Sequence, residues 1–304
     1  MHGGILHVNH IKDQIHCERA YRMGLSGKGI GVAVLDTGIF LHRDFDSRVT
    51  GFADMVNRRN FAYDDCGHGT HICGIIGGSG RMSGGRYSGI APGGNLIMVK
   101  VLDRKGNGYS SDVLAGISWV LERKEQLGIR ILNISVGACS KRGMSENSAL
   151  VKGVNRAWDA GLVVVVAAGN NGPRTMSITT PGISRKVITV GCSDDDREVL
   201  VGGNRMVDYS GRGPTAACIC KPDLVAPGCS VVSCSSRADK YTIKSGTSMS
   251  TPIVSGAVAL LLERFPDMSN KDVKLRLRES SVDIGLPRNQ QGWGLLDVGK
   301  MLER

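Results

Sequence analysis

Gly31-Val-Ala-Val-Leu-Asp-Thr-Gly38 is the stretch that decides the fold of this sequence. An unbroken run of apolar residues, with no polar residue at every second position, is typical of a strand buried on both faces of a parallel sheet. Further apolar runs are found at residues 96–102, 129–136, 162–168 and 187–190. Segments with helical spacing lie between or after them, at residues 68–78, 110–127, 148–160 and 247–264. Strands that alternate with helices predict an α/β protein, with a three-layer α/β/α fold and a mostly parallel central sheet.

The composition is that of a globular protein. The 304 residues are 41% hydrophobic and 22% charged, which is too apolar for a disordered chain. The longest apolar run, residues 162–168, is far shorter than the ~18 residues that a membrane-spanning helix needs. The N-terminal residues also lack the pattern of a secretory signal. We therefore expect a cytoplasmic protein that has no membrane partner.

The cysteine content and the net charge indicate the redox compartment and the kinds of partner. Nine scattered cysteines, an odd number, favour free thiols in a reducing compartment over a disulfide framework. The formal net charge is +10, but the basic residues are dispersed in short pairs such as Arg58-Arg59 and Arg185-Lys186. Aromatic residues are not interleaved with them, as they are in many proteins that bind single-stranded nucleic acid. We expect a solvated positive surface and no nucleic-acid partner.

Four polar residues form a candidate catalytic set. Asp36 and Asn170 follow apolar runs. His68 and Ser248 stand near the starts of predicted helices. In an open parallel sheet, all four positions lie at the edge formed by the carboxyl ends of the strands. A hydrolytic serine needs a base, an acid that orients the base, and donors for the oxyanion, and this set supplies each of them. The glycines on both sides of His68 are expected to leave its ring open to a substrate.

Each of these residues taken alone also has a structural explanation. Asp36 fits a turn or a helix cap, and Asn170 fits a turn cap. His71, three residues after His68, is expected to pack in the core and not to bind a metal, because no third ligand is nearby. The joint occurrence of the four residues in one predicted edge favours the catalytic interpretation.

The segments around these residues resemble the subtilisin-like serine proteases, or subtilases. The order Asp, His, Asn, Ser is that of the family, and so are the spacings of 32 residues from Asp36 to His68 and of 180 from His68 to Ser248. The resemblance covers about residues 20–300 and is greatest to the intracellular bacterial branch. Further similar segments are Gly89-Ile-Ala-Pro92, Val99-Lys-Val-Leu102, Tyr209-Ser-Gly-Arg-Gly-Pro214, Pro222-Asp-Leu-Val-Ala-Pro-Gly228 and Gly292-Trp-Gly-Leu-Leu-Asp297.

The resemblance implies a serine endopeptidase that hydrolyses peptide bonds in extended polypeptides through an acyl-enzyme. Ser248 is then the nucleophile, and His68 is the general base and acid. Asp36 orients His68 and stabilises its charged form. Asn170 Nδ2 and the backbone N–H of Ser248 form the oxyanion hole.

The resemblance also implies where a substrate binds. A polypeptide lies as an extra strand between residues 105–108 and 133–137, and the glycines let one main chain approach the other. The pocket for the P1 side chain lies between residues 135–137 and 167–169, which are small or apolar, so we expect uncharged, apolar P1 residues. The implied substrate-binding residues are Gly106, Gly108, Ser135, Val136, Gly137, Ala167 and Gly169.

This chemistry requires no cofactor, and we assign no metal ligand. Calcium, which many subtilases bind, would involve Asp44 and residues 77–89, but that loop contains Arg81 and Arg86 and few oxygen ligands. We expect a peptidase domain at residues 21–304 and a short N-terminal extension at residues 1–20. We hypothesise that residues 1–15 lie across the active-site cleft.

Two other functions stay open at this point. One is a dedicated processing peptidase that cleaves a single precursor peptide. The other is a catalytically inactive relative that only binds peptides, and the complete set of Asp36, His68, Asn170 and Ser248 argues against it.

Overall fold

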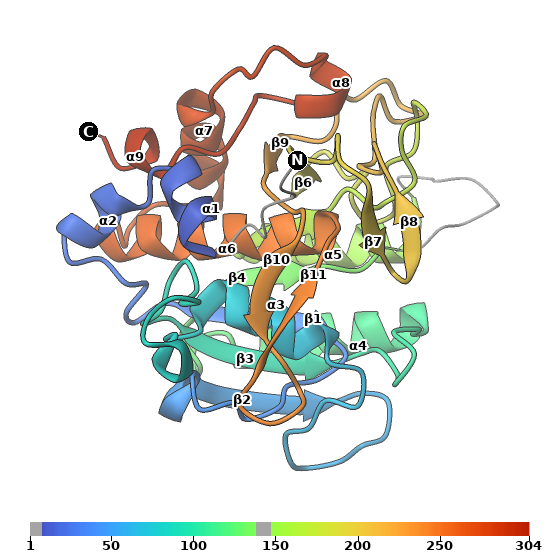
Figure 1. Cartoon of the computed structure of the whole chain (residues 1–304). Helices are drawn as coiled ribbons and strands as arrows, with labels where there is room; N and C mark the ends of the chain where they lie inside the picture. The colour runs from blue at the N-terminus through green and yellow to red at the C-terminus, as the bar shows by residue number, and fades with distance from the viewer. Residues whose placement is uncertain (1–7, 138–146, 304) are drawn as a thin grey trace.

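A central parallel sheet organises the protein. The computed structural model describes residues 8–137 and 147–303. In this part of the chain seven strands form one sheet in the order β2-β3-β1-β4-β5-β6-β9, and all neighbouring strands are parallel (Figure 1). The strands are β1 (Gly31–Asp36), β2 (Val49–Asp54), β3 (Asn95–Lys100), β4 (Ile129–Ile134), β5 (Val163–Ala167), β6 (Ile188–Cys192) and β9 (Leu224–Ala226).

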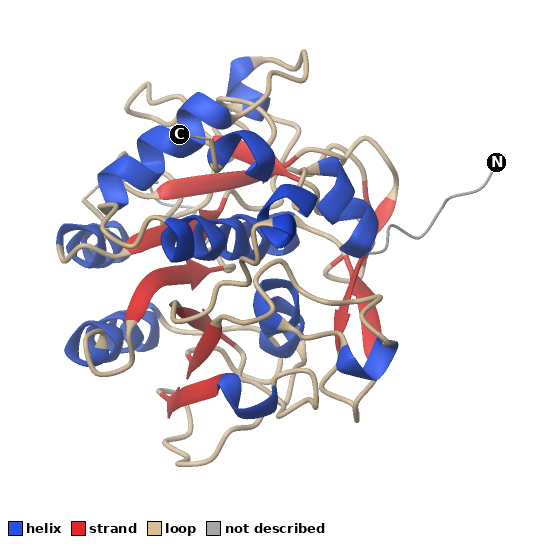
Figure 2. Ribbon diagram, turned by 90° about the vertical axis from the view of Figure 1, so that its left-hand side faces the viewer, coloured by secondary structure: helices blue, strands red, loops and turns tan. Residues whose placement is uncertain are grey.

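Helices cover both faces of this sheet. On one face α3 (His68–Gly77) and α6 (Thr247–Arg264) pack against each other and against β1. On the other face α4 (Ser110–Arg123) packs against α5 (Ala149–Asp159). Figure 2 shows the strands between these two groups of helices. The predicted three-layer α/β/α fold is confirmed.

The burial of these elements follows from their sequences. All residues of β5 are buried, as expected for a strand that is covered on both faces. In α6 every residue from Met249 to Leu262 is buried. A helix that packs against a sheet on one side and other helices on the other needs no polar face, which explains why α6 has no amphipathic pattern.

Some elements differ from the sequence expectation. The helix expected at residues 110–127 ends at Arg123, and the strand expected at 162–168 spans Val163–Ala167. The edge strand β2 was missed because it is only partly buried and contains a glycine, Gly51. The hairpins were also missed, because short half-exposed strands have no continuous apolar run. The other elements are β7 (Val199–Val201), β8 (Asn204–Met206), β10 (Val231–Cys234), β11 (Tyr241–Lys244), α1 (Val8–Gln14), α2 (Glu18–Arg22), α7 (Asn270–Ser280), α8 (Arg288–Gln291), α9 (Val298–Met301) and the 3₁₀ turns Asp46–Arg48 and Arg81–Ser83.

The described part of the N-terminal segment belongs to the core. Ile11 and Ile15 are fully buried. The carbonyl of Ile15 accepts a hydrogen bond from the N–H of Val298 in α9, and α1 contacts β10. The hypothesis that residues 1–15 lie across the cleft is therefore wrong for residues 8–15, while residues 1–7 lie outside the described residues. The division between extension and domain at residue 20 stays a prediction.

His71 fastens the β10–β11 hairpin to α3. It is fully buried, and its Nε2 lies 3.1 Å from the carbonyl of Val231 and 3.2 Å from that of Thr242. Both partners are acceptors, so Nε2 carries the proton and donates to both strands. Burial, and more weakly the ammonium of Lys244, lower the pKa of His71 to about 3. The predicted packing role is confirmed.

We expect His71 to make stability depend on pH. In the unfolded chain the imidazole takes up a proton near its ordinary pKa of about 6.5, whereas in the folded protein it stays neutral down to about pH 3. Its contribution is therefore complete above about pH 6.5, and falls by about 1 kcal/mol per pH unit as the pH drops below that value. Urea unfolding at pH 7, 6 and 5 measures this slope, with Ser248→Ala introduced in every protein to prevent self-digestion.

The informative variant is His71→Gln, which keeps an N–H donor but does not titrate. It should unfold with a shallower pH dependence than the parent protein, whatever its absolute stability. His10→Gln is the control, because His10 is exposed. An unchanged slope in His71→Gln would contradict this account.

Candidate active site

Asp36 and His68 meet at the edge where β1 ends and α3 begins. Asp36 is fully buried, and His68 Nδ1 lies 2.8 Å from its Oδ1 and 3.0 Å from its Oδ2. The N–H of Thr37 also donates to Oδ1, at 2.8 Å. A carboxylate only accepts hydrogen bonds, so Nδ1 carries the ring proton. The neutral ring therefore presents an unprotonated Nε2.

The environment of His68 favours its protonated form. Burial acts to lower the pKa of His68, but the charge of Asp36 and the hydrogen bond to it outweigh this effect and raise the pKa above its usual value. Lys244 opposes this rise and Asp64 supports it, both more weakly. The exposed fraction of the His68 side chain is 23%, so the ring can still reach a bound molecule.

Two close backbone contacts hold α3 against the end of β1. A Cβ at Gly69 would lie 2.2 Å from the carbonyl oxygen of Gly38, and a Cβ at Gly38 would lie 2.1 Å from that of Tyr63. Gly67 has a φ of +89°, a left-handed conformation that favours glycine. Gly69 is needed because the helix start and the strand end approach too closely for a side chain. The expectation that Gly67 and Gly69 leave the ring of His68 open to a substrate stays a prediction.

Asp64 is a positioning residue that the sequence analysis missed. Its Oδ1 accepts from the N–H of Gly67 and from Thr37 Oγ1, at 2.8 and 2.9 Å. Its Oδ2 accepts from the N–H and the hydroxyl of Thr70, at 2.9 and 2.6 Å. An acidic side chain at the start of a helix also interacts favourably with the helix dipole. The pair Asp64-Asp65 before Gly67-His68 was the available signal.

Ser248 is the second residue of α6, and its hydroxyl points toward β4. Its Oγ donates to the carbonyl oxygen of Ser135 at 2.7 Å. The proton transfer expected from Ser248 to His68 requires a hydrogen bond between Oγ and Nε2, which is not among the contacts of the described residues. Rotation about the single Cα–Cβ bond of Ser248 redirects the hydroxyl. Hydrogen bonds of this kind often form only in the substrate complex.

Thr247, also missed by sequence analysis, fixes the orientation of Asn170. The N–H and the hydroxyl of Thr247 both donate to Asn170 Oδ1, at 3.0 Å each. Because Oδ1 receives both donors, Nδ2 is the end of the amide that remains for another acceptor. A Cβ at Gly246 would lie 3.3 Å from Nδ2. Glycine at this position, with a φ of +139°, therefore leaves room beside the amide.

His68, Asn170 and Ser248 line one cleft of about 460 Å³. A second cavity of about 210 Å³ shares part of this lining and has apolar walls that include Leu102, Val113 and Pro181. The structure thus brings all seven implied substrate-binding residues to these two cavities. Gly106, Ser135, Val136, Gly137, Ala167 and Gly169 line the cleft, and Gly106, Gly108, Val136 and Gly137 line the second cavity.

Three of the glycines in these walls are required by contacts within the protein. A Cβ at Gly137 would lie 2.2 Å from Thr179 Oγ1, and one at Gly169 would lie 2.4 Å from Thr179 Cγ2. A Cβ at Gly108 would lie 2.4 Å from the carbonyl oxygen of Val101. The expected approach of a substrate main chain is therefore not the only reason for glycine at these three positions. Thr179 lines the cleft and contacts the positions of two of these glycines, and no sequence pattern distinguishes it from other threonines.

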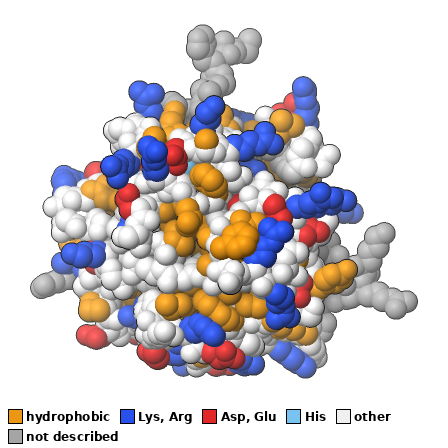
Figure 3. All heavy atoms as spheres, turned by 90° about the horizontal axis from the view of Figure 1, so that it is seen from below, with side chains coloured by type: hydrophobic (Ala, Val, Ile, Leu, Met, Phe, Trp, Pro, Cys, Tyr) orange, Lys and Arg blue, Asp and Glu red, His pale blue; other side chains and the backbone are white. Residues whose placement is uncertain are grey.

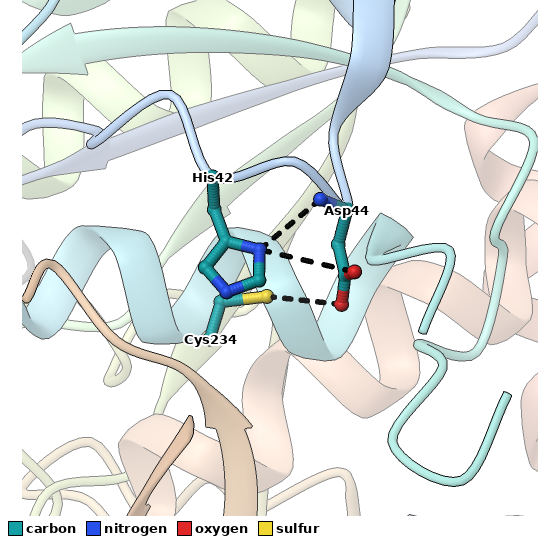
Figure 4. Close-up of side chains that lie close together, drawn as sticks. All are labelled: His42, Asp44 and Cys234. Atoms are coloured by element: carbon teal, nitrogen blue, oxygen red, sulfur yellow. Dashed lines mark hydrogen bonds and ion pairs between the residues drawn. The ribbon is translucent and has the colours of Figure 1, made fainter. Parts of the chain in front are cut away.

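The surroundings of Asp44 do not fit a calcium ion. Asp44 is fully buried beside His42 and Cys234 (Figure 4). Its Oδ1 accepts from the N–H of Met82 at 2.9 Å, and its Oδ2 accepts from the hydroxyl of Tyr241 at 2.7 Å. His42 Nδ1 accepts from the N–H of Asp44 at 3.1 Å. Donors within the protein therefore already occupy both carboxylate oxygens and this ring nitrogen.

Arg48 occupies the carbonyl oxygens that a calcium ion would need. Its guanidinium donates to the carbonyl oxygens of Asp44 and Gly77, both at 2.5 Å, and to that of Gly94 at 3.3 Å. Calcium binds to such carbonyl and carboxylate oxygens. The Arg48 guanidinium therefore already satisfies carbonyl oxygens beside Asp44.

The described cysteines are free thiols, as expected, and Cys139 lies outside the described residues. Cys66 lines the cleft beside His68. Cys192 and Cys229 are buried behind the start of α6, where both contact the hydroxyl of Tyr209. Among residues 8–137 and 147–303, none of the helices combines the length and the hydropathy that a bilayer crossing requires.

Comparisons with known proteins agree with this geometry. The model of the subtilase family matches residues 27–294. Serine protease AprX of Bacillus subtilis (strain 168) is 42% identical over 285 residues, which cover 88% of this chain, and the chain spans 64% of the length of that protein. Subtilisin DY of Bacillus licheniformis is 32% identical, over 93% of this chain and 94% of its own length.

Among solved structures, that of sphericase superposes with a TM-score of 0.75 at 31% identity and covers 90% of this chain and 93% of its own. A cold adapted subtilisin-like serine proteinase superposes with a TM-score of 0.73 at 29% identity. The family model begins before β1 and ends after α8, so it includes every residue of the site described above. By sequence, fold and site geometry together, this chain belongs to the subtilase family.

Proposed function

We propose that this protein is a serine endopeptidase that cleaves extended polypeptides through an acyl-enzyme on Ser248. The observation that carries the proposal is the buried Asp36–His68 pair, which shares one cleft with Ser248 and an Asn170 of fixed orientation. A protein that only binds peptides has no need of this pair. The serine proteases and subtilisins among its relatives support the same reaction class.

Acylation begins when the Ser248 hydroxyl turns from the carbonyl of Ser135 toward His68 Nε2. Nε2 accepts the proton as Oγ attacks the carbonyl carbon of the scissile bond. The imidazolium that forms is stabilised by Asp36, whose carboxylate already faces Nδ1. His68 then gives the proton to the departing amine, and a water molecule hydrolyses the acyl-enzyme by the same sequence of proton transfers.

The negative oxygen of each tetrahedral intermediate accepts hydrogen bonds from Asn170 Nδ2 and from the N–H of Ser248. Asn170 is oriented for this because Thr247 holds its Oδ1. The Ser248 N–H is available because the first N–H groups of a helix have no partner within it. Donors that are fixed before the reaction stabilise the developing charge without reorganisation.

The substrate we propose is a polypeptide with an uncharged, apolar P1 side chain. Val136, Ala167 and Gly169 supply small or apolar walls near Ser248. We propose no nucleic-acid partner, because basic side chains are scattered and interspersed with acidic ones on the face shown in Figure 3. Such a surface has no continuous basic patch for a phosphate backbone.

We place the protein in a reducing compartment, the cytoplasm. The support is the cysteine content, because nine scattered cysteines, an odd number, favour free thiols in a reducing compartment over a disulfide framework.

The first test is labelling with a fluorophosphonate probe, together with hydrolysis of a peptide amide that has an apolar P1 residue. Wild type should label and cleave. Ser248→Ala should do neither, with kcat lowered by about 10⁶-fold, as in subtilisin without its nucleophile. Asn170→Ala should retain the nucleophile but lose about 10²- to 10³-fold in kcat, because one oxyanion donor is gone. Folded wild-type protein that neither labels nor cleaves would refute the proposal.

Thr247→Val tests the orientation of Asn170. Valine keeps the shape of threonine but removes the hydroxyl, so Asn170 Oδ1 keeps only the backbone donor. Loss of one such hydrogen bond predicts a kcat lower by about 2- to 10-fold with little change in KM. In an Asn170→Ala background the same substitution should have almost no further effect. Equal losses in both backgrounds would show that Thr247 does not act through Asn170.

We also propose that the loop at Asp44 is stable without calcium. The support is Arg48, which binds the carbonyls of Asp44, Gly77 and Gly94. The melting temperature of Ser248→Ala protein should then be the same in excess EDTA as in millimolar calcium. Adding Arg48→Met, which keeps the apolar stem but removes the guanidinium, should lower it by several degrees. A fall in EDTA that calcium reverses would contradict this proposal.

A further inference from the structure

The described side chains that line the cleft include positive charges but no negative ones. Besides His68, the described lining residues that carry a charge are Lys105 and Lys244, and the described lining includes no aspartate or glutamate. Within the described part of the chain neither lysine has an ion-pair partner. The cleft walls therefore carry positive charge without a compensating negative one.

The carboxylates nearest to the cleft are engaged elsewhere. Asp36 is buried beneath His68, and Asp64 accepts hydrogen bonds from Gly67 and Thr70 at the start of α3. Asp65 pairs with the buried ammonium of Lys100 at 2.7 Å. Among the described residues, none of these carboxylates forms an ion pair with Lys244.

Lys244 lines the same cleft as His68 and Ser248. It is the last residue of β11, four residues before Ser248, and it is half-buried. Its charge opposes the rise in the pKa values of Cys66 and His68 and adds to the fall in the pKa of His71. Lys105 is an exposed residue beside Gly106, on the side where the acyl part of a substrate is expected.

The position of Lys244 is fixed by the fold. His71 donates to the carbonyls of Val231 and Thr242, which ties the hairpin that carries Lys244 to the helix that carries His68. On its other side, Lys244 is connected to Ser248 by only three residues, 245–247. These links fix where the backbone of Lys244 lies relative to His68, and the side chain is half-buried.

We propose that Lys244 lies on the leaving-group side of the cleft, away from the residues 105–108 expected to bind the acyl part, and selects substrates with an aspartate or glutamate immediately after the scissile bond, at P1′ or P2′. This inference rests on the proposed peptidase function and names the substrate class for that site. A carboxylate there gains attraction from the ammonium, and a lysine or arginine there is repelled. Because the site is partly open to water, we expect about a 5- to 10-fold preference in kcat/KM for Glu over Lys at low ionic strength.

The same geometry has a consequence for pH dependence. The groups that face His68 are Asp36 from β1, Asp64 and Cys66 from the turn before α3, and Lys244 from β11. The ammonium disfavours the imidazolium, so its removal raises the pKa of His68. Activity requires neutral His68, and the acid limb of kcat/KM should therefore move to higher pH in Lys244→Gln. This shift of the acid limb tests whether Lys244 lies near His68, and it does not depend on the P1′ residue of the peptide.

The preference is tested with quenched fluorescent peptides that share one apolar P1 residue and carry Glu, Gln or Lys at P1′ or P2′. For each enzyme only the ratio of kcat/KM between peptides is compared, so the fraction of folded protein cancels. Wild type should prefer Glu to Gln and Gln to Lys, and the ratio should shrink at high salt. Lys244→Gln should remove most of the preference, and Lys244→Glu should reverse it. Lys240→Gln, the same change in the same hairpin but outside the cleft lining, should leave the ratio as in wild type.

The outcomes separate this inference from the proposed function. Cleavage of all peptides at similar rates by wild type would overturn the role of Lys244 and leave the peptidase function standing. A Glu preference that persists in Lys244→Glu would also overturn it. Folded wild-type protein that labels with no fluorophosphonate and cleaves no peptide would overturn both.

Discussion

The contact between the buried carboxylate of Asp36 and the ring of His68 is the interaction on which the site depends. A carboxylate taken out of water is costly unless it is paired and hydrogen-bonded. Asp36 meets that requirement through His68 Nδ1 and the N–H of Thr37. The same bond fixes the tautomer of His68, so folding stability and catalytic readiness are properties of one contact.

That contact in turn requires the start of α3 to lie unusually close to the end of β1. Gly38 and Gly69 permit the approach, because each would place a Cβ within 2.2 Å of a backbone oxygen. Asp64 then binds both partners, since it accepts from Thr37 on the strand side and from Thr70 in the helix. Substitution at any of these positions acts on His68 without touching a substrate.

α3 also positions the other half of the site, which lies in the β10–β11 hairpin and α6. Three residues after His68, His71 holds the hairpin that leads through Lys244 and Gly246 into α6. From the first turn of α6, Thr247 orients Asn170 and Ser248 reaches the end of β4. The base, the nucleophile, the oxyanion donor and the proposed specificity residue are thus connected by short hydrogen-bonded links, which favours a preorganised site.

The sequence by itself determined the layers of the fold and the residues of the catalytic set. Continuous apolar runs such as Val163–Ala167 have one stable environment, a sheet covered on both faces, and polar residues at their ends must then gather at one edge. The family resemblance added the roles of Asp36, His68, Asn170 and Ser248. These inferences rest on local pattern, which a single sequence contains.

Only the tertiary structure decided how those residues are held. Asp64, Thr247 and Thr179 act through partners that are distant in the chain, and no local pattern distinguishes them from ordinary polar residues. The packing requirement for Gly69 has the same origin, since a missing side chain is explained only by what would occupy its space. The contacts of Arg48 with the carbonyls of Asp44 and Gly77, and the position of Lys244 at the cleft, likewise depend on which groups three-dimensional packing places within hydrogen-bonding or Coulombic range.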